Sequence, residues 1–408
     1  MTGAPDRRAG RPPHLYVHVP FCARKCAYCD FVSYPRAAAG GGPAVRRYLE
    51  TLAREAGWYA GRLAPTPIST VYVGGGTPSV LTSSELRALL AVLSDTCGPW
   101  AEGAEVTAEV NPGTADAGKL AVLREAGVNR LSVGVQSFDE ALLRRVGRFV
   151  KPDEVYTTVQ AAREAGFANL SLDLIFGLPG QTLEGLEEDL RRAVDLEPEH
   201  LSVYALTLEE GTPLAEEVAA GRAVLPGEAV EAEMFALASA VLRQAGYRHY
   251  ELSNFAQPGR EARHNLAYWH NEDYLALGPA ASGHAGLLRY RNAPGLGEYE
   301  RLLAEGRRKP GQAGAGGEGF PLSPAAVEVE RLSLRQAMGE TAFLALRLVE
   351  EGLDREAFRR RFGRDPLDVW GGELARLERE GLVEVAPTAV RLTAKALPVA
   401  NLVFSAFV

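Results

Sequence analysis

The sequence predicts an α/β fold: an open, partial barrel of parallel strands followed by a smaller helical domain. Two observations support this prediction. Short β-rich runs alternate with longer amphipathic patterns, which is typical of strand–helix units around a parallel sheet. This rhythm fades after about residue 225, where helical patterns and then a β-hairpin pattern take over.

Six strands are expected in the first part of the chain, each followed by a polar or Gly-rich turn. They are residues 15–19, 70–75, 105–110, 130–135, 170–176 and 201–206. A weak repeat also precedes strand runs, in "LREAGVNRLSV", "AREAGFANLSL" and "LRQAGYRHYEL", where Gly127, Gly166 and Gly246 suit a left-handed helix cap. Because six units fall short of a closed eight-unit barrel, we expect a partial barrel with its site at the carboxyl ends of the strands.

The chain divides into five predicted parts. Residues 1–13 indicate a disordered N-terminal tail, 14–225 the barrel, and 226–305 connecting helices and strands. The Gly- and Pro-rich "KPGQAGAGGEGFPLSP" predicts a flexible loop at 306–325. Residues 326–408 resemble a winged-helix-like domain, for which we expect a lid or partner-docking role. Its basic "RRRFG" lies among acidic residues, which favours a solvated helix face over nucleic-acid binding.

Composition excludes several functional classes. The 408 residues carry a net charge of -8, which gives no basic footprint, so nucleic acid is not expected as a general partner. No stretch reaches the roughly 18 uninterrupted apolar residues of a membrane span, and the first thirteen residues do not read as a secretory signal. We therefore expect a cytoplasmic protein, where closely spaced cysteines favour metal or redox chemistry over disulfides.

Three of the four cysteines lie in "CARKCAYCD", directly after the first strand. They are Cys22, Cys26 and Cys29. The CxxxCxxC spacing lets one loop wrap thiolates around a 4Fe-4S cluster, and because such clusters usually have four cysteine ligands, one iron would stay open to a small molecule. A zinc site with His18 or Asp30 as fourth ligand is the alternative. Cys97 lies apart, as a buried or incidental thiol.

This loop resembles the signature of the radical S-adenosylmethionine (SAM) superfamily, in which SAM chelates the open iron. The resemblance covers most of residues 14–290, through "VGGGTPS", "AEVNPG", "GVQSF", "GRFV" and "LDLIFGLPGQT". It implies a SAM pocket lined by Tyr16, Gly75, Gly76, Thr77, Glu109, Gln136, Arg148 and Asp173. The Gly run would supply close backbone approach and free N–H groups. Each residue alone could instead cap a loop, satisfy a strand end or lie on a solvated helix.

Within the superfamily, "YVHVPFCARKCAYCDF", "GGGTPS", "NRLSVGVQSF" and "DLIFGLPGQT" are similar to the oxygen-independent coproporphyrinogen III oxidase group. That group looks like two lineages, a porphyrinogen-oxidising enzyme and a haem chaperone that keeps the cluster and SAM. Three features favour the chaperone lineage. Phe31 stands where the oxidase has a further cysteine, only about a dozen residues precede the first strand, and "HNLAYW" matches the chaperone motif HNxxYW.

The "HNLAYW" stretch supplies the haem-binding candidates. A neutral imidazole at His264 suits haem iron as an axial ligand, and Tyr268 and Trp269 offer flat apolar faces to a porphyrin. The alternative is that His264 is a hydrogen-bonded histidine in a turn and that the aromatic residues are core. The histidines that compete for the role of ligand are His18, His249, His270 and His284.

The resemblance implies a haem chaperone that binds a 4Fe-4S cluster, SAM and haem, and delivers haem to recipient haemoproteins, with respiratory enzymes among the candidates. Transient contact with a membrane protein is compatible with this expectation. The alternative is a coproporphyrinogen III oxidase or another SAM-dependent radical enzyme.

Overall fold

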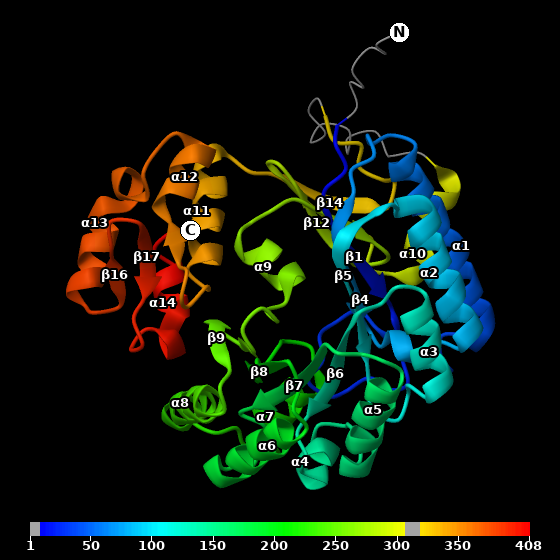
Figure 1. Cartoon of the computed structure of the whole chain (residues 1–408), viewed down its shortest axis with the longest axis horizontal. Coiled ribbons are helices and arrows are strands. Elements are labelled where there is room, and N and C mark those ends of the chain that lie inside the picture. The colour runs from blue at the N-terminus through cyan, green and yellow to red at the C-terminus, as the bar shows by residue number, and fades with distance from the viewer. Residues whose placement is uncertain (1–8, 307–318) are drawn as a thin grey trace.

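The computed structural model describes residues 9–306 and 319–408, and is built around one large sheet (Figure 1). Its strand order is β14-β13-β12-β11-β1-β4-β5-β6-β7-β8-β10-β9. The six predicted strands are present and pair in parallel with their neighbours, which confirms the partial barrel. They are β1 (His14–Val19), β4 (Ile68–Gly75), β5 (Trp100–Val110), β6 (Arg130–Gln136), β7 (Leu170–Phe176) and β8 (His200–Ala205).

The sheet continues beyond both predicted edges. Next to β1, β11 (Tyr274–Leu277) adds a parallel strand, and β12 (Ser282–Ala285), β13 (Leu288–Asn292) and β14 (Ala326–Arg331) follow in antiparallel order. Next to β8, β10 (Asn254–Ala256) and β9 (Arg248–Glu251) form an antiparallel edge. The predicted connecting part, 226–305, therefore builds much of the sheet. β14 also belongs to this sheet, although the sequence placed residues from 326 onward in the C-terminal domain.

Helices surround the outer face of the sheet (Figure 1). They are α1 (Gly41–Ala60), α2 (Ser83–Cys97), α3 (Ala117–Glu125), α4 (Glu140–Arg145), α5 (Pro152–Glu164), α6 (Leu183–Asp195), α7 (Pro213–Ala219), α8 (Glu228–Gln244) and α10 (Leu296–Glu305), with a 3-10 turn η1 (Pro78–Val80). The predicted glycine caps are confirmed, because Gly127, Gly166 and Gly246 have φ angles of 90°, 87° and 91°.

Alternation along each strand separates an apolar outer layer from a polar interior. In β1, Leu15 and Val17 are fully buried in the core under the helices. The residues that alternate with them, His14 and Tyr16, point to the opposite face of the sheet, as the strand period requires. The inner face of the curved sheet, called the lumen below, is therefore lined by polar and aromatic side chains.

The C-terminal domain has its own core, which includes Phe358, Trp370 and Leu374. Its elements are α11 (Leu334–Ala345), β15 (Leu353–Asp354), α12 (Arg355–Phe362), α13 (Pro366–Arg379), β16 (Val383–Val385), β17 (Ala389–Leu392), η3 (Leu397–Val399) and α14 (Ala400–Phe404). β16 and β17 form the predicted hairpin after the helices. The order of helices and hairpin is the one that the sequence predicts.

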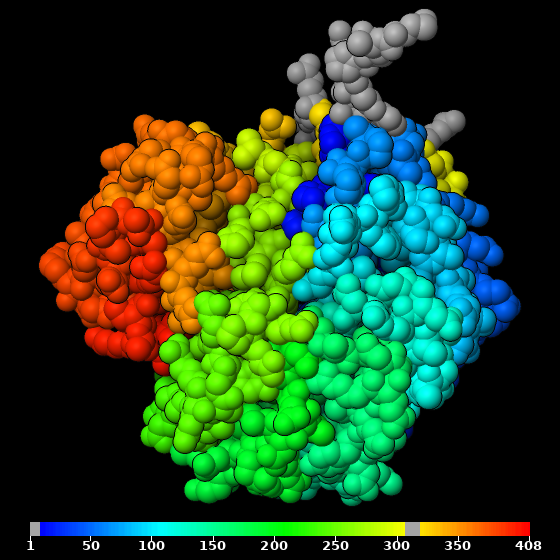
Figure 2. All heavy atoms as spheres, viewed as in Figure 1, coloured from blue at the N-terminus to red at the C-terminus, as the bar shows by residue number. Residues whose placement is uncertain are grey.

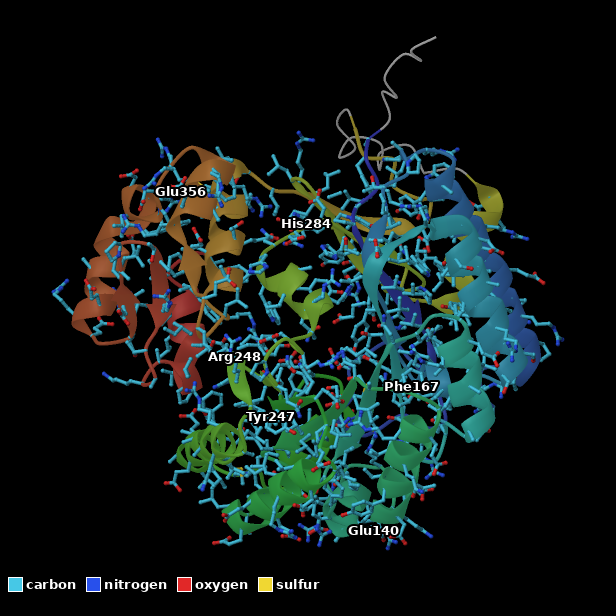
Figure 3. All side chains as sticks on the ribbon, viewed as in Figure 1. Glu140, Phe167, Tyr247, Arg248, His284 and Glu356 are labelled. Carbon is cyan, nitrogen blue, oxygen red and sulfur yellow. The ribbon has the colours of Figure 1, made fainter. Side chains whose placement is uncertain are left out.

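This domain packs against the edge of the sheet beside β9 (Figures 1 and 2). The Leu252 N–H donates to the Arg347 carbonyl at 3.1 Å, and the Val349 N–H donates to the Tyr250 carbonyl at 3.0 Å. Arg248, labelled in Figure 3, pairs with Glu350 across the same junction. Backbone and side-chain contacts thus join the two domains.

Two predicted segments fall partly outside the described residues, namely 1–8 of the tail and 307–318 of the loop. The rest of the tail departs from the predicted disorder. Gly10 forms a β-bridge with Ala64, and the buried Arg11 donates to the carbonyls of Thr66 and Gly98. Across the described residues, no helix is long and apolar enough to cross a membrane.

Candidate functional site

The loop that carries the three cysteines is held at its base and in its middle. β2 (Phe21–Cys22) pairs with β3 (Tyr34–Pro35) and closes the base. Midway, the Ala27 N–H donates to the Val146 carbonyl at 2.8 Å, and the Ala27 carbonyl accepts from the Leu214 N–H at 2.9 Å. The loop therefore has a defined shape at the rim of the sheet, and its three thiols are partly exposed.

Hydrogen-bond donors face two of these thiols. The Thr77 hydroxyl lies 3.5 Å from Cys22 Sγ, and Arg148 Nη1 lies 3.9 Å from Cys26 Sγ. Burial raises the pKa of the Cys22 thiol, and raises that of Cys29 to about 11. Bound iron would favour the thiolate form and so offset the effect of burial on the thiol pKa. The two donors would stabilise the thiolates further, so the loop fits a cluster held by cysteine sulfur.

The structure also bears on the zinc alternative and on the fourth cysteine, Cys97. Among the described residues, no three or more His, Cys, Asp or Glu side chains form a group that could hold a metal ion. The zinc centre considered from the sequence would be such a group, and the three cysteines of the cluster would be one as well, so this observation does not separate the two and zinc stays an alternative. Cys97 is buried at the end of α2, away from the loop, as the sequence predicts.

Glu109, near the carboxyl end of β5, is a carboxylate of the predicted SAM pocket that two donors hold in place. The Tyr72 hydroxyl donates to Glu109 Oε1 at 2.8 Å, and the Gly75 N–H donates to Oε2 at 3.1 Å. Burial, reinforced by the nearby charge of Asp173, raises the pKa of Glu109 to about 7 in spite of these donors. A Cβ on Gly74 would lie 2.7 Å from the Glu109 carboxyl carbon, so glycine leaves room for this side chain.

The Gly run does not offer the free N–H groups that the sequence suggested. The Gly75 N–H is taken by Glu109, the Gly76 N–H donates to the Val19 carbonyl at 2.9 Å, and the Thr77 N–H donates to the Phe21 carbonyl at 2.7 Å. Close backbone approach is present between two stretches of the protein, whereas approach to SAM stays a prediction. A Cβ on Gly76 would lie 2.6 Å from the Phe21 oxygen, which explains the glycine.

Asn111, which sequence reasoning missed, connects several predicted residues. Its Nδ2 donates to the Thr77 hydroxyl at 2.9 Å, and its Oδ1 accepts from Arg148 Nη2 at 3.0 Å. A Cβ on Gly134 would meet Asn111, Arg148 and Gln136 together, which places these three side chains side by side. The residue stands in the quoted "AEVNPG", two positions after Glu109, and this strand-end position was the available signal.

The other predicted SAM residues lie in the lumen. Asp173 accepts from the Ser132 hydroxyl at 2.9 Å, and burial raises its pKa. The Tyr16 ring stacks on Tyr72 with centroids 6.3 Å apart. Burial also raises the pKa of Tyr204 on β8, yet this residue is 41% exposed, a combination expected of a side chain in a deep, water-accessible interior.

The predicted residues thus form two adjoining groups. Thr77, Gln136 and Arg148 lie beside the cysteine loop, whereas Tyr16, Glu109 and Asp173 lie in the lumen. Gly75 joins the groups through its bond to Glu109. The convergence expected of polar residues at successive strand ends is therefore present.

The "HNLAYW" stretch forms α9 (Arg263–Trp269), which lies between the sheet and the C-terminal domain (Figure 1). The Glu105 carboxylate on β5 accepts from the Arg263 N–H and from the His264 N–H, each at 3.0 Å. A carboxylate at a helix N-terminus is favourable because unpaired N–H groups point toward it. These bonds anchor α9 to the sheet.

His264 is 1% exposed, and both of its ring nitrogens have partners. Thr70 Oγ1 lies 2.6 Å from Nδ1, and the Tyr268 hydroxyl lies 2.9 Å from Nε2. Burial lowers the pKa of His264 to about 3, so its ring is neutral. In this arrangement neither nitrogen is free for iron, which matches the alternative of a hydrogen-bonded core histidine. Haem ligation by His264 requires one of these bonds to break.

The remaining haem candidates differ in their surroundings. The Arg347 guanidinium lies 4.4 Å from the Trp269 ring centroid. His18, His249 and His284 are buried and hydrogen-bonded. His270 is the more exposed histidine, and its bond to Glu351 raises its pKa.

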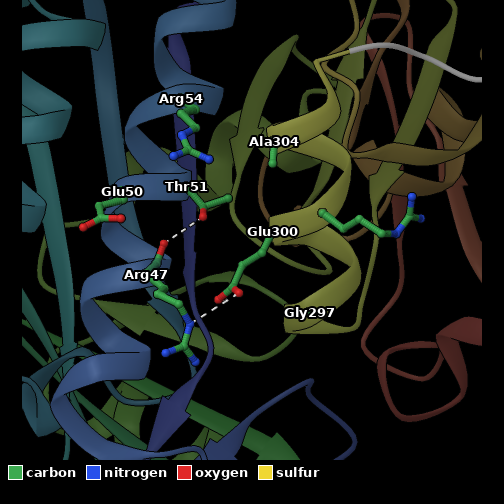
Figure 4. A pocket seen from close by; sticks show the side chains of 8 residues that line it. Arg47, Glu50, Thr51, Arg54, Gly297, Glu300 and Ala304 are labelled. Atoms are coloured by element: carbon green, nitrogen blue, oxygen red, sulfur yellow. Dashed lines mark hydrogen bonds and ion pairs between the residues drawn. The ribbon is translucent and has the colours of Figure 1, made fainter.

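A separate hollow of about 400 Å³ lies on the outer surface between α1 and α10 (Figure 4). Arg47 and Glu300 face each other across it, 3.6 Å apart. No residue that the sequence predicted as functional lines this hollow. It is therefore unrelated to the lumen.

Comparisons with known proteins agree with this geometry. A family model of the radical SAM superfamily matches residues 16–193, and one of the HemN C-terminal domain matches 332–399. The protein named heme chaperone HemW of Bacillus subtilis is 36% identical over 392 residues, which cover 96% of this chain and 98% of that protein. The chain belongs to the HemW family. Escherichia coli HemW is 40% identical over 67% of this chain and 70% of its own length.

Among solved structures, the coproporphyrinogen III oxidase HemN of Escherichia coli, a radical SAM enzyme, has a TM-score of 0.81 and 26% identity. The match covers 98% of this chain and 91% of HemN. The partial barrel, the C-terminal domain and the relation to both lineages are thereby confirmed. Membership of the radical SAM superfamily implies a 4Fe-4S cluster and SAM as cofactors of this HemW-family chain.

Proposed function

We propose that this chain is a haem chaperone, which binds haem and delivers it to recipient haemoproteins. The observation that carries the proposal is the similarity to heme chaperone HemW, which extends over almost the whole of both chains. The motif "HNLAYW" and Phe31 in place of a further cysteine point in the same direction.

In this proposal the cluster is held by Cys22, Cys26 and Cys29, and the residues around Glu109 hold SAM. The donors from Thr77 and Arg148 toward sulfur support the first assignment. The second is supported by the buried carboxylate of Glu109, which lies where the cationic part of SAM would gain a partner. When bound, the cluster would supply an open iron position for SAM.

Haem is assigned to α9, with His264 as iron ligand and with Tyr268 and Trp269 beside the porphyrin. The helix lies at the junction of the two domains, so a ligand there would contact both. Because both ring nitrogens of His264 are bonded in this conformation, haem binding requires a local rearrangement of α9 or its neighbours.

Partners follow from the same proposal. The chaperone would act in the cytoplasm on recipient haemoproteins, including respiratory enzymes, with transient contact to those held in membranes. The C-terminal domain would serve as a lid or docking surface, because it lies beside α9 (Figure 1).

A coproporphyrinogen III oxidase is the second candidate, supported by the similarity to HemN over 98% of this chain. Incubating reconstituted protein with coproporphyrinogen III, SAM and a strong reductant separates the two candidates. We expect no protoporphyrinogen above the level of a cluster-free control. Sustained protoporphyrinogen formation would replace the chaperone proposal with the oxidase.

A further inference from the structure

A continuous chain of hydrogen bonds leads from the protein surface to α9. Glu272 Oε2 lies 2.8 Å from His14 Nε2, and His14 Nδ1 lies 2.9 Å from Thr70 Oγ1. The same Thr70 oxygen lies 2.6 Å from His264 Nδ1. His264 Nε2 lies 2.9 Å from the Tyr268 hydroxyl. The chain thus begins at a half-exposed carboxylate and ends at a half-buried tyrosine.

Only one arrangement of protons gives every donor in this series of hydrogen bonds an acceptor. Among the described residues the Tyr268 hydroxyl has no partner other than His264, so it donates to Nε2. Nδ1 of His264 then carries the ring proton and donates to Thr70, which in turn donates to Nδ1 of His14. Nε2 of His14 donates to the Glu272 carboxylate. Both histidines are then neutral, and they are opposite tautomers.

We propose that Thr70, His14 and Glu272 are positioning residues that fix the ring proton of His264 on Nδ1 and so keep Nε2 available as the ligand atom for haem iron. This inference rests on the proposed haem function. Histidines that bind metals usually donate their other ring N–H to an oxygen acceptor, which fixes the tautomer and orients the ring. The Thr70 hydroxyl is that acceptor here. Glu272 keeps the proton of His14 on Nε2, so Nδ1 of His14 accepts the hydroxyl proton of Thr70 and directs it away from His264.

Tyr268 occupies the position that iron would need, and it covers Nε2 while haem is absent. His264 is held independently of Tyr268, because its ring stacks on Tyr72 at 5.3 Å and Glu105 anchors its backbone. A rotation of the Tyr268 side chain would therefore expose Nε2 while the bond to Thr70 persists. The bond of His14 lowers the pKa of Glu272, which keeps this carboxylate an acceptor.

The proton arrangement is tested first on the protein without haem. Nitrogen-15 NMR of histidine-labelled protein, with His14→Gln and His264→Gln variants to assign the signals, distinguishes the tautomers. We expect an Nε2–H tautomer at His14 and an Nδ1–H tautomer at His264. A charged His14 together with an Nε2–H tautomer at His264 would overturn the proposal.

The second test uses the haem complex. Thr70→Val keeps the shape of the side chain but removes the hydroxyl, whereas Thr70→Ser keeps the hydroxyl. By analogy with other partners of metal-binding histidines, Thr70→Val should weaken haem binding by roughly 10- to 100-fold. In the ferrous complex it should also lower the iron–histidine stretching frequency measured by resonance Raman spectroscopy. Thr70→Ser should restore both quantities.

Thr51→Val is the matched control. Thr51 is a buried threonine on α1 whose hydroxyl donates to the Arg47 carbonyl of the same helix at 2.7 Å (Figure 4). It should change neither haem affinity nor the iron–histidine band. A folded Thr70→Val variant with the parent's affinity and band would contradict a positioning role.

The haem-binding function and the positioning role of Thr70 can be overturned separately. If the parent protein binds no haem, the proposed function and this inference are both overturned. If the parent binds haem and His264→Ala binds it equally well, the chaperone function stands and the positioning role of Thr70 is overturned.

Discussion

Replacing Glu109 by Gln removes one negative charge from the lumen and keeps the size of the side chain. The structure sets the orientation of the new amide. The Gly75 N–H can only donate, so the amide oxygen stays opposite it, and the amide nitrogen faces the Tyr72 hydroxyl, which can turn to accept. The fold should therefore be retained.

The two consequences of Glu109→Gln differ in size. One charge-assisted bond from Tyr72 becomes a neutral one, and the repulsion from Asp173 is relieved, so the free energy of unfolding should change by only about 1 kcal/mol. A bond from the cationic part of SAM to the carboxylate is worth about 1.5–3 kcal/mol. Its loss corresponds to roughly 10- to 150-fold weaker SAM binding.

The pH dependence has a defined sign. With a pKa raised to about 7, Glu109 is protonated at lower pH, so SAM affinity of the parent should fall as the pH drops below about 7. The Gln variant lacks this group, and this part of the pH dependence should disappear. Isothermal titration calorimetry on anaerobically reconstituted protein measures both effects. Parent-like SAM affinity and an unchanged pH profile in the Gln variant would refute the assignment.

The remaining predictions concern the cluster, haem and stability. Replacing Cys22, Cys26 and Cys29 together by Ala should abolish the cluster iron, measured by iron analysis and absorption. Cys97→Ala should retain the cluster iron, because this thiol lies apart at the end of α2. A full iron complement in the triple variant would contradict the site. His264→Ala should lose most haem binding in a Soret titration with cluster content unchanged, and parent-like binding would exclude it as ligand. Glu55 accepts hydrogen bonds from Gly278, Asn292, Tyr299 and Ser323, and burial raises its pKa to about 7. The stability that the protonated Glu55 contributes to the folded state is therefore fully present below pH 4.5 and is lost as the pH rises through 7. The free energy of unfolding of the parent should therefore fall by about 3 kcal/mol relative to Glu55→Gln over that range, measured by urea denaturation, and parallel curves would refute this.

The parts of the fold with strong local patterns could be predicted from the sequence. The six parallel strands have apolar outer positions such as Leu15 and Val17, and turns follow them. The added edge strands could not be recognised, because a run as short as "YLAL" in β11 does not distinguish a strand from a helix. Residues 326–331, which the sequence analysis placed in the C-terminal domain, instead form β14 of the large sheet, because strand pairing depends on neighbours distant in sequence.

The cysteine loop of the candidate site was visible in a short motif, but its supporting contacts were not. Thr70 and His14 have no motif that connects them to His264, and Glu272 is distant from His14 in the sequence. Asn111 likewise contacts Arg148 only because two strand ends converge. Hydrogen bonds between separate strands become visible only once the sheet is formed, which is also why the bonded state of the Gly-run N–H groups was missed.

The most direct test of the chaperone function is haem transfer. The protein is loaded with haem, freed of excess ligand, and mixed with the haem-free form of a haemoprotein from the same organism, and the spectrum and activity of the recipient are followed. We predict that the recipient gains haem and activity faster from this chain than from haem-loaded serum albumin at the same concentration. Haem that stays bound, or transfer no faster than from albumin, would contradict the proposed function.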